Sequence, residues 1–305
     1  DLHIVMDVSA AMGIGATAAD QSLTAGAAST LNCALACHTK SVHYLPTDSD
    51  TLARAQALGA QTRIATLRKA VQDALAAAQA TAKGNQLRVA LYAMSNTLST
   101  VHPLSAGLPG ATTAAGAVEV TGAIGQGGSN ISYALTQLND LVATSGDGSS
   151  QKAAKQIVLL AASGVQNSNR IIACTSAATL DSRCTGANRS TTTTQKDPNW
   201  LGDYAPFQSF PAIAGNPVLQ SIDPSYCAPL KAKGARVMTL TAEYVVPTVG
   251  GGLNDARLDF VTSLLPRVKA NMAACASSAA DARYARDAAD IDKAIAAMVA
   301  SAAPA

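Results

Sequence analysis

The sequence is poor in charged residues, aromatic residues and long apolar runs. Of its 305 residues, 14% are charged and 4% are aromatic, whereas about 25% of an ordinary globular protein is charged. The net charge is only +2 and no lysine- or arginine-rich run occurs, which argues against nucleic acid as a partner. No stretch reaches the roughly 18 consecutive apolar residues of a membrane-spanning helix. The 48% of hydrophobic residues is instead enough for the core of one large domain.

A recognisable signal peptide is also missing. The chain opens directly on the apolar run Leu2–Met6, which is typical of a core strand. Because native proteins rarely begin inside a strand, we interpret the sequence as a mature or excised portion of a longer chain.

The cysteines favour disulfides over a metal site. The sequence holds four histidines and no Cys-x-x-Cys, which argues against zinc. An even cysteine count and a surface rich in Ser, Thr, Gly and Asn favour an exported protein. The six disulfide candidates are Cys33, Cys37, Cys174, Cys184, Cys227 and Cys275. One of the roughly 15 possible arrangements pairs Cys33 with Cys37, Cys174 with Cys184 and Cys227 with Cys275.

A different use of one cysteine pair is left open. The run Cys33-x-x-x-Cys37-His38 differs by one residue from the motif that attaches haem covalently. A haem would also need an apolar pocket and a second axial ligand. The simpler interpretation is a small disulfide-closed loop.

Apolar runs alternate with helical patterns along the chain. We expect strands at 4–6, 87–94, 98–101, 157–162, 237–242 and 282–285, and helices at 64–84, 131–141, 260–272 and 291–298. Strands separated by helices indicate an α/β fold, with a central, mostly parallel sheet flanked by helices. We therefore predict one domain, 1–305, that carries two long loop insertions, at about 10–60 and 166–225.

The insertions should meet at one edge of this sheet. Residues 12–50 have a loop-like composition, and each insertion follows the carboxyl end of a predicted strand. Open α/β sheets bind their ligands at that edge. We call it the rim, and expect it to hold residues 7–13, 127–130, 163–167 and the two insertions.

One motif at this rim resembles a known family. Asp7-Val8-Ser9-Ala10-Ala11-Met12-Gly13 follows the first strand and is similar to the Asp-x-Ser-x-Ser-Met-Gly that opens von Willebrand factor type A domains. That resemblance implies a von Willebrand A (Rossmann-like) fold. It also implies a metal-ion-dependent adhesion site (MIDAS), with candidate ligands at Asp7, Ser9, Ser129 and Ser163.

The resemblance is incomplete at two of the five ligand positions. Ala11 replaces a serine and Ser163 replaces an aspartate, so Asp7 alone would contribute charge. Mg²⁺ and Ca²⁺ require several oxygen ligands, and the resemblance therefore implies a degenerate MIDAS with at most weak Mg²⁺ or Ca²⁺ binding and no other cofactor. In the alternative interpretation, Asp7 and Ser9 only accept hydrogen bonds from loop N–H groups.

A narrower resemblance covers most of the chain. The run Asn32-Cys-Ala-Leu-Ala-Cys-His38 is similar to a signature of TadG-like proteins from tight-adherence (Flp-type) pilus systems, as are Cys227-Ala-Pro-Leu-Lys231 and Ala273-Ala-Cys-Ala-Ser277. TadG-like proteins carry an N-terminal membrane segment, which this sequence lacks. The resemblance implies an exported pilus component, periplasmic or extracellular, that is associated with the pilus or the cell surface.

The expected function is adhesion or pilus assembly rather than catalysis. No Gly-x-Ser-x-Gly occurs, and the glycine-rich run 122–128 lacks the lysine of a phosphate-binding loop. We expect the rim to bind pilus subunits, or a host or abiotic surface, with Asn130, Gln166 and Asn167 among the contacts. A self-assembling surface or filament subunit is the alternative, because the surface is weakly charged and rich in Ala, Ser and Thr.

Overall fold

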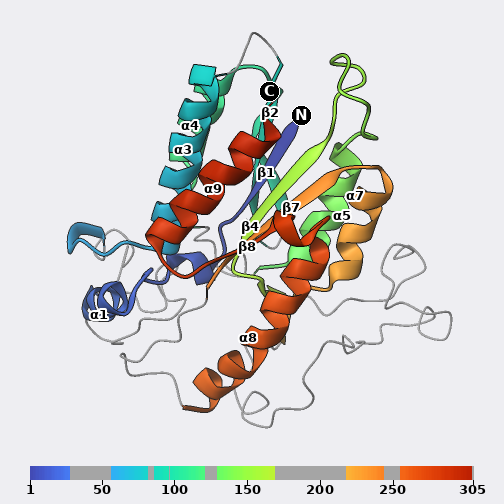
Figure 1. Cartoon of the computed structure of the whole chain (residues 1–305). Coiled ribbons are helices and arrows are strands. Elements are labelled where there is room, and N and C mark those ends of the chain that lie inside the picture. Colours follow the sequence, from blue (N-terminus) through green and yellow to red (C-terminus); the bar gives the residue numbers. More distant parts are fainter. Residues whose placement is uncertain are drawn as a thin grey trace, which may run out of the picture.

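The computed structural model describes residues 1–27, 56–81, 86–95, 97–120, 129–168, 218–243 and 255–303. Within them, six strands form one sheet in the order β3-β2-β1-β4-β7-β8 (Figure 1). Their bounds are β1 (Leu2–Asp7), β2 (Val89–Met94), β3 (Leu98–Ser105), β4 (Ile157–Ala162), β7 (Arg236–Ala242) and β8 (Ala282–Ala285). Neighbouring strands are parallel except β2 and β3, which confirms the predicted mostly parallel sheet.

The central strand β1 explains why the apolar runs are continuous. All six of its residues are buried, since helices cover both faces of the sheet. Leu2, Ile4 and Met6 pack with the helices of one face, and Val5 packs with those of the other. The first face carries α3 (Arg63–Thr81), α4 (Leu108–Gly116) and α9 (Ala288–Ala302), and the second carries α5 (Ile131–Leu141), α7 (Ala228–Ala232) and α8 (Asp255–Cys275).

Part of the segment predicted to be loop is helical. Residues 10–13 form the short 3₁₀ helix η1 (Ala10–Gly13) and are followed by α1 (Ala18–Ala27). The N–H of Asp20 donates to the Thr17 hydroxyl, and the N–H of Thr17 donates back to the Asp20 carboxylate, both at 3.1 Å. This reciprocal cap begins the helix at a Thr-x-x-Asp spacing, so the loop interpretation was wrong for 18–27. Residues 28–55 lie outside the described residues.

Two further elements differ from the sequence prediction. The helix α4 was not predicted; it begins at Leu108 with a proline in its first turn, where the missing N–H costs nothing. The edge strand β3 extends to Ser105, beyond the predicted 98–101. It pairs with β2 in antiparallel fashion through an irregular register.

A small second sheet flanks most of the segment predicted to be the second insertion. Its strands β5 (Val165–Ser168) and β6 (Val218–Ser221) are antiparallel. Both strands belong to a segment for which the sequence indicated only irregular structure. The residues between them, 169–217, lie outside the described part of the chain.

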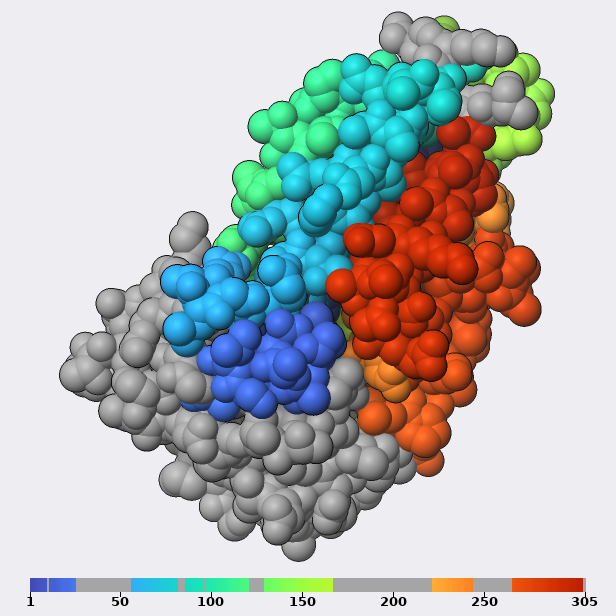
Figure 2. All heavy atoms as spheres, turned by 60° about the vertical axis from the view of Figure 1, so that its left-hand side comes forward, coloured from blue at the N-terminus to red at the C-terminus, as the bar shows by residue number. Residues whose placement is uncertain are grey.

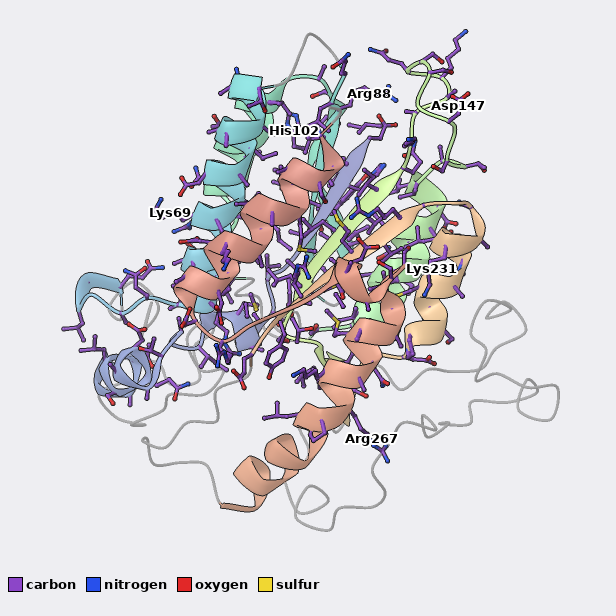
Figure 3. The ribbon with its side chains drawn as sticks, in the orientation of Figure 1. Lys69, Arg88, His102, Asp147, Lys231 and Arg267 are labelled. Atoms are coloured by element: carbon purple, nitrogen blue, oxygen red, sulfur yellow. A yellow bond between two sulfur atoms is a disulfide. The ribbon has the colours of Figure 1, made fainter. Side chains whose placement is uncertain are left out.

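One predicted disulfide is present. Cys227, at the end of η3 (Pro224–Cys227), is bonded to Cys275, the last residue of α8, with 5.4 Å between their Cα atoms. The Lys231 ammonium donates to the carbonyls of Ala274 and Ala276 at the same junction (Figure 3). The bond therefore joins α8 to the η3–α7 segment. The other four cysteines lie outside the described residues.

Both described ends of the chain lie at the pole opposite the rim. The carbonyl of Asp1 accepts the N–H of Ile157 at the start of β4, and the Arg236 guanidinium at the start of β7 donates to the carbonyl of Ser301. Figure 1 shows the two ends of the chain close together there. None of the described helices has the length and hydropathy needed to span a membrane.

A buried polar network occupies this pole. The His3 ring stacks on Tyr92 and is hydrogen bonded to its hydroxyl at 3.1 Å and to the Gln156 Oε1 at 3.0 Å. The Gln156 amide donates to the Asp1 carboxylate, which also accepts a bidentate pair from Arg88 at 2.7 Å (Figure 3). Since Gln156 Oε1 accepts, His3 Nε2 carries a proton, while the Tyr92 hydroxyl can donate to Nδ1 of a neutral ring or accept from a protonated one. Burial lowers the pKa of His3 and so favours the neutral imidazole in this network.

We expect the free energy of unfolding to fall as the pH drops below 6.5, the ordinary pKa of a histidine side chain. Burial lowers the pKa of His3, although its hydrogen bond to Gln156 opposes this. Below 6.5 the unfolded chain binds a proton that the folded chain excludes, so the free energy of unfolding decreases by up to about 1.4 kcal/mol per pH unit. Above that pH the contribution is fully present.

Urea unfolding of the wild type and His3→Gln between pH 5 and 8 tests this expectation. Glutamine keeps hydrogen-bonding capacity but does not titrate. The difference between the two free energies should be constant above pH 7.5 and change below 6.5. Parallel curves throughout would contradict a neutral, buried His3.

Candidate functional site

The rim brings together two residues that are far apart in the sequence. Asp7 ends β1, and Ser163 follows β4, the neighbouring parallel strand. The Ser163 N–H and Oγ–H both donate to Asp7 Oδ2, at 3.2 and 3.1 Å. The other carboxylate oxygen, Oδ1, accepts the N–H of Ser9 at 2.9 Å. Asp7 therefore links the two loops that follow β1 and β4.

Asp7 is completely buried, with 0% of its surface exposed. Burial raises the pKa of its carboxyl group, and the hydrogen bonds from Ser9 and Ser163 act in the opposite direction. A carboxylate removed from water is costly unless donors or cations compensate it. The backbone and hydroxyl of Ser163 supply two of the three donors.

Two buried hydroxyls at the rim lack hydrogen-bond partners. The Ser9 Oγ and Ser129 Oγ are buried, and neither has a hydrogen-bond partner in the described structure. The Ser9 hydroxyl lies close enough to lower the pKa of Asp7, but outside hydrogen-bonding geometry. Ser129 reaches the rim because its neighbour, Asn130, donates its N–H to the carbonyl of Ser95 at the end of β2. An unpaired buried hydroxyl costs about 1–3 kcal/mol.

These residues fit a tightly bound divalent cation poorly. The set has one carboxylate, Asp7, which already accepts three hydrogen bonds, and the Ser163 hydroxyl is used as a donor. Glu243 follows β7, which β4 separates from β1, so it lies two strand spacings away, about 10 Å. Among the described residues, no three His, Cys, Asp or Glu side chains lie together in a way that could hold a metal ion. Weak Mg²⁺ or Ca²⁺ binding through Asp7, Ser9, Ser129 and Ser163 remains a prediction.

The amides expected to contact a partner have structural contacts here. Asn130 caps α5 by accepting the N–H of Tyr133 at 3.2 Å. Gln166 Oε1 accepts the N–H of Ser132 at 2.7 Å, while its Nε2 donates to the carbonyl of Ser221. Both side chains are buried. Asn167 lies opposite Leu219 in the small sheet. Their role in partner binding stays a prediction.

The sequence analysis missed one exposed aromatic residue at the rim. Tyr133 lies in the first turn of α5, three residues after Asn130, and 40% of its surface is exposed. Its signal was the N-cap sequence Ser129-Asn130 before a helical pattern, which places residue 133 in the first turn. Exposure on the outer face of that turn could not be read from periodicity alone.

Gly164 lets a helix pack directly against the site. Its φ is +73°, a conformation that glycine adopts without strain. A Cβ at this position would lie 2.7 Å from Val268 Cγ1 and 2.9 Å from Met272 Cγ, both on α8. The Gly164 carbonyl also accepts the N–H of Ile222. The position of Ser163 therefore depends on the packing of α8 against the next residue.

Comparison with known proteins gives structural similarity only. No protein-family model and no curated protein matches the sequence. The chain is similar in structure to the pilus adhesin SpaC from Lactobacillus rhamnosus GG, with 13% identity and a TM-score of 0.51 over 99% of this chain and 30% of that chain. The vWF domain of the type V pili tip protein Mfa5 from Porphyromonas gingivalis has 13% sequence identity and a TM-score of 0.46, over 99% of this chain and 94% of that chain. Proximal thread matrix protein 1 from the mussel byssus, in a structure with a zinc-occupied MIDAS motif, has 10% sequence identity and a TM-score of 0.45, over 98% of this chain and 46% of that chain.

The similarity to SpaC concerns the fold, because its identity is low and this chain spans 30% of the length of SpaC. Together with the strand order β3-β2-β1-β4-β7-β8, it confirms the predicted fold class, a von Willebrand A (Rossmann-like) sheet flanked by helices. The narrower resemblance to TadG-like proteins stays a prediction.

We predict that Gly164→Ala destabilises the domain by about 3 kcal/mol or more. The substitution combines a positive φ with overlap against Val268 and Met272 on α8. Gly148→Ala is the matched control, because its φ is +86° but its new Cβ would meet only the flexible Lys155 side chain, at 3.3 Å. That control should lose about 1 kcal/mol. Equal losses in chemical denaturation would contradict the packing argument.

Proposed function

We propose that this chain is an exported, non-enzymatic adhesion or assembly component of a tight-adherence (Flp-type) pilus. The observation that carries the proposal is the polarity of the domain. Both described chain ends lie at one pole and the rim lies at the other (Figure 1). A domain attached through that pole presents its rim outward, where a partner or a surface can reach it. The fold shared with the SpaC pilus adhesin supports this proposal.

Export to the periplasm or the extracellular space is supported by the disulfide between Cys227 and Cys275. Both cysteines are fully buried, and disulfides of this structural kind persist in oxidising compartments. The pilus assignment can be tested by the genes on either side of the gene for this chain. A tight-adherence protein should be encoded beside a pilus-secretion apparatus. An unrelated neighbourhood would argue against it.

Contact at this rim should depend on exposed side chains rather than on a bridging metal ion. The four candidate ligands are buried, at 0–2% exposure, whereas Tyr133 beside them is 40% exposed. Exposed tyrosines provide large, rigid contact areas and often dominate binding energy. We therefore assign Tyr133 as a contact residue of the rim.

Beads that carry the purified chain should attach to glass, polystyrene or epithelial cells equally well with and without EDTA. Tyr133→Ala should reduce attachment roughly tenfold, as expected for the loss of an aromatic anchor. Leu141→Ala is the control, since Leu141 is 54% exposed at the other end of the same helix, and it should leave attachment unchanged. A large loss in EDTA, or equal losses for both variants, would count against the proposed rim.

A second candidate is a self-assembling surface or filament subunit. Helices α3 and α9 lie side by side on one face of the molecule (Figure 2). Their outward positions include six exposed alanines: Ala76, Ala77, Ala80, Ala296, Ala297 and Ala300. Small uncharged side chains allow close packing between copies. Light scattering on a size-exclusion column separates the candidates, because an adhesin should elute as a monomer and a filament subunit as concentration-dependent oligomers.

A further inference from the structure

We infer that Ser163 takes the place of a cation at Asp7, and that a carboxylate at position 163 would turn this part of the rim into a divalent-cation site. The inference concerns the chemistry of the buried carboxylate and does not depend on the adhesive function. It starts from the mismatch between the residues present and the metal that the sequence resemblance implies.

The Asp7 carboxylate is stabilised by the protein alone. Its two oxygens accept the N–H of Ser9, the N–H of Ser163 and the hydroxyl of Ser163. Charge-assisted hydrogen bonds of this kind compensate a buried charge in the way that a cation would. The two N–H donors are backbone groups, so the Ser163 hydroxyl is the donor that a side-chain substitution removes.

One neutral oxygen suited to a cation site lies close to this carboxylate. The Ser9 Oγ is buried without a hydrogen-bond partner two residues after Asp7, and the Ser129 Oγ at the rim is also buried without one. Hydroxyl oxygens are acceptable ligands for Mg²⁺ and Ca²⁺, but affinity increases with the number of charged ligands. With one charge, the present set leaves a divalent cation poorly neutralised. The missing element is a second carboxylate within reach of Asp7.

Position 163 is where that carboxylate would lie. The Ser163 Oγ is 3.1 Å from Asp7 Oδ2, so an aspartate there would set two buried negative groups against each other. Two carboxylates at such a distance cannot both ionise without compensation. A bound cation removes the repulsion, so binding and folding stability become coupled.

Thermal unfolding of the wild type, Ser163→Asp and Ser163→Asn in EDTA and in millimolar Mg²⁺, Ca²⁺ or Mn²⁺ tests the inference. The wild-type Tm should change by less than about 1 °C, because a site with a single carboxylate binds a divalent cation weakly at most. The Tm of Ser163→Asp should be several degrees lower in EDTA and rise by roughly 5 °C or more at cation concentrations far above Kd. Ser163→Asn has the same shape without the charge and should not respond. Calorimetric titration with each metal alone should give a saturable binding heat for Ser163→Asp only.

Two results would overturn the inference. One is a wild-type Tm that rises in the cations as much as the Tm of Ser163→Asp, because Ser163 would then not have replaced the metal. The other is a Ser163→Asp variant that is insensitive to all three cations, whether it is folded or unfolded in their presence. A variant that is unfolded in EDTA but folds in Mg²⁺ supports the inference. Bead attachment plays no part in these readouts, so they can fail independently of the proposed function.

Discussion

The buried carboxylate of Asp7 is the constraint on which the rim depends. It ends the central strand, has no exposed surface and is held by donors from both neighbouring loops. Because β1 and β4 are adjacent and parallel, one hydrogen-bonded group fixes the chain direction after both strands. Gly164 then brings α8 against the same turn, so the site and the helix layer are set by consecutive residues. A change at Ser163 therefore affects charge balance and packing together.

This arrangement changes what the rim can do. A site that presents an open metal recognises a ligand through that metal's free coordination position. Here Asp7, Ser9 and Ser163 are buried, so in the proposed function recognition would rest on exposed side chains such as Tyr133. Shape and polar contacts are less sensitive to chelators than a bridging ion. The buried Ser9 and Ser129 hydroxyls are then an unfavourable contribution that the rest of the core must offset.

The sequence predicted the fold correctly where a local residue pattern reflects the tertiary environment of a segment. Continuous apolar runs such as 157–162 predicted strands buried on both faces, and alternation with helices predicted their parallel order. The pairing of Cys227 with Cys275 was among the expected arrangements. The helix α1 was missed because its composition is weakly apolar, although Thr17 and Asp20 carried the capping signal. The donation from Ser163 to Asp7 could not be predicted, because it depends on rotamers and on the contact of two loops 156 positions apart.

The two ends of β1 show why the polar residues of this core are not interchangeable. His3 lies near its start in a hydrogen-bonded network that runs through Gln156 to the ion pair between Asp1 and Arg88. Asp7 lies at its end, at a rim that also holds the two unpaired hydroxyls of Ser9 and Ser129. Full satisfaction at one pole favours rigidity where both chain ends lie, whereas incomplete satisfaction leaves the other pole open to change by a single substitution. The same strand thus joins a pole where the described chain ends lie to a pole where a single substitution can alter the charge balance.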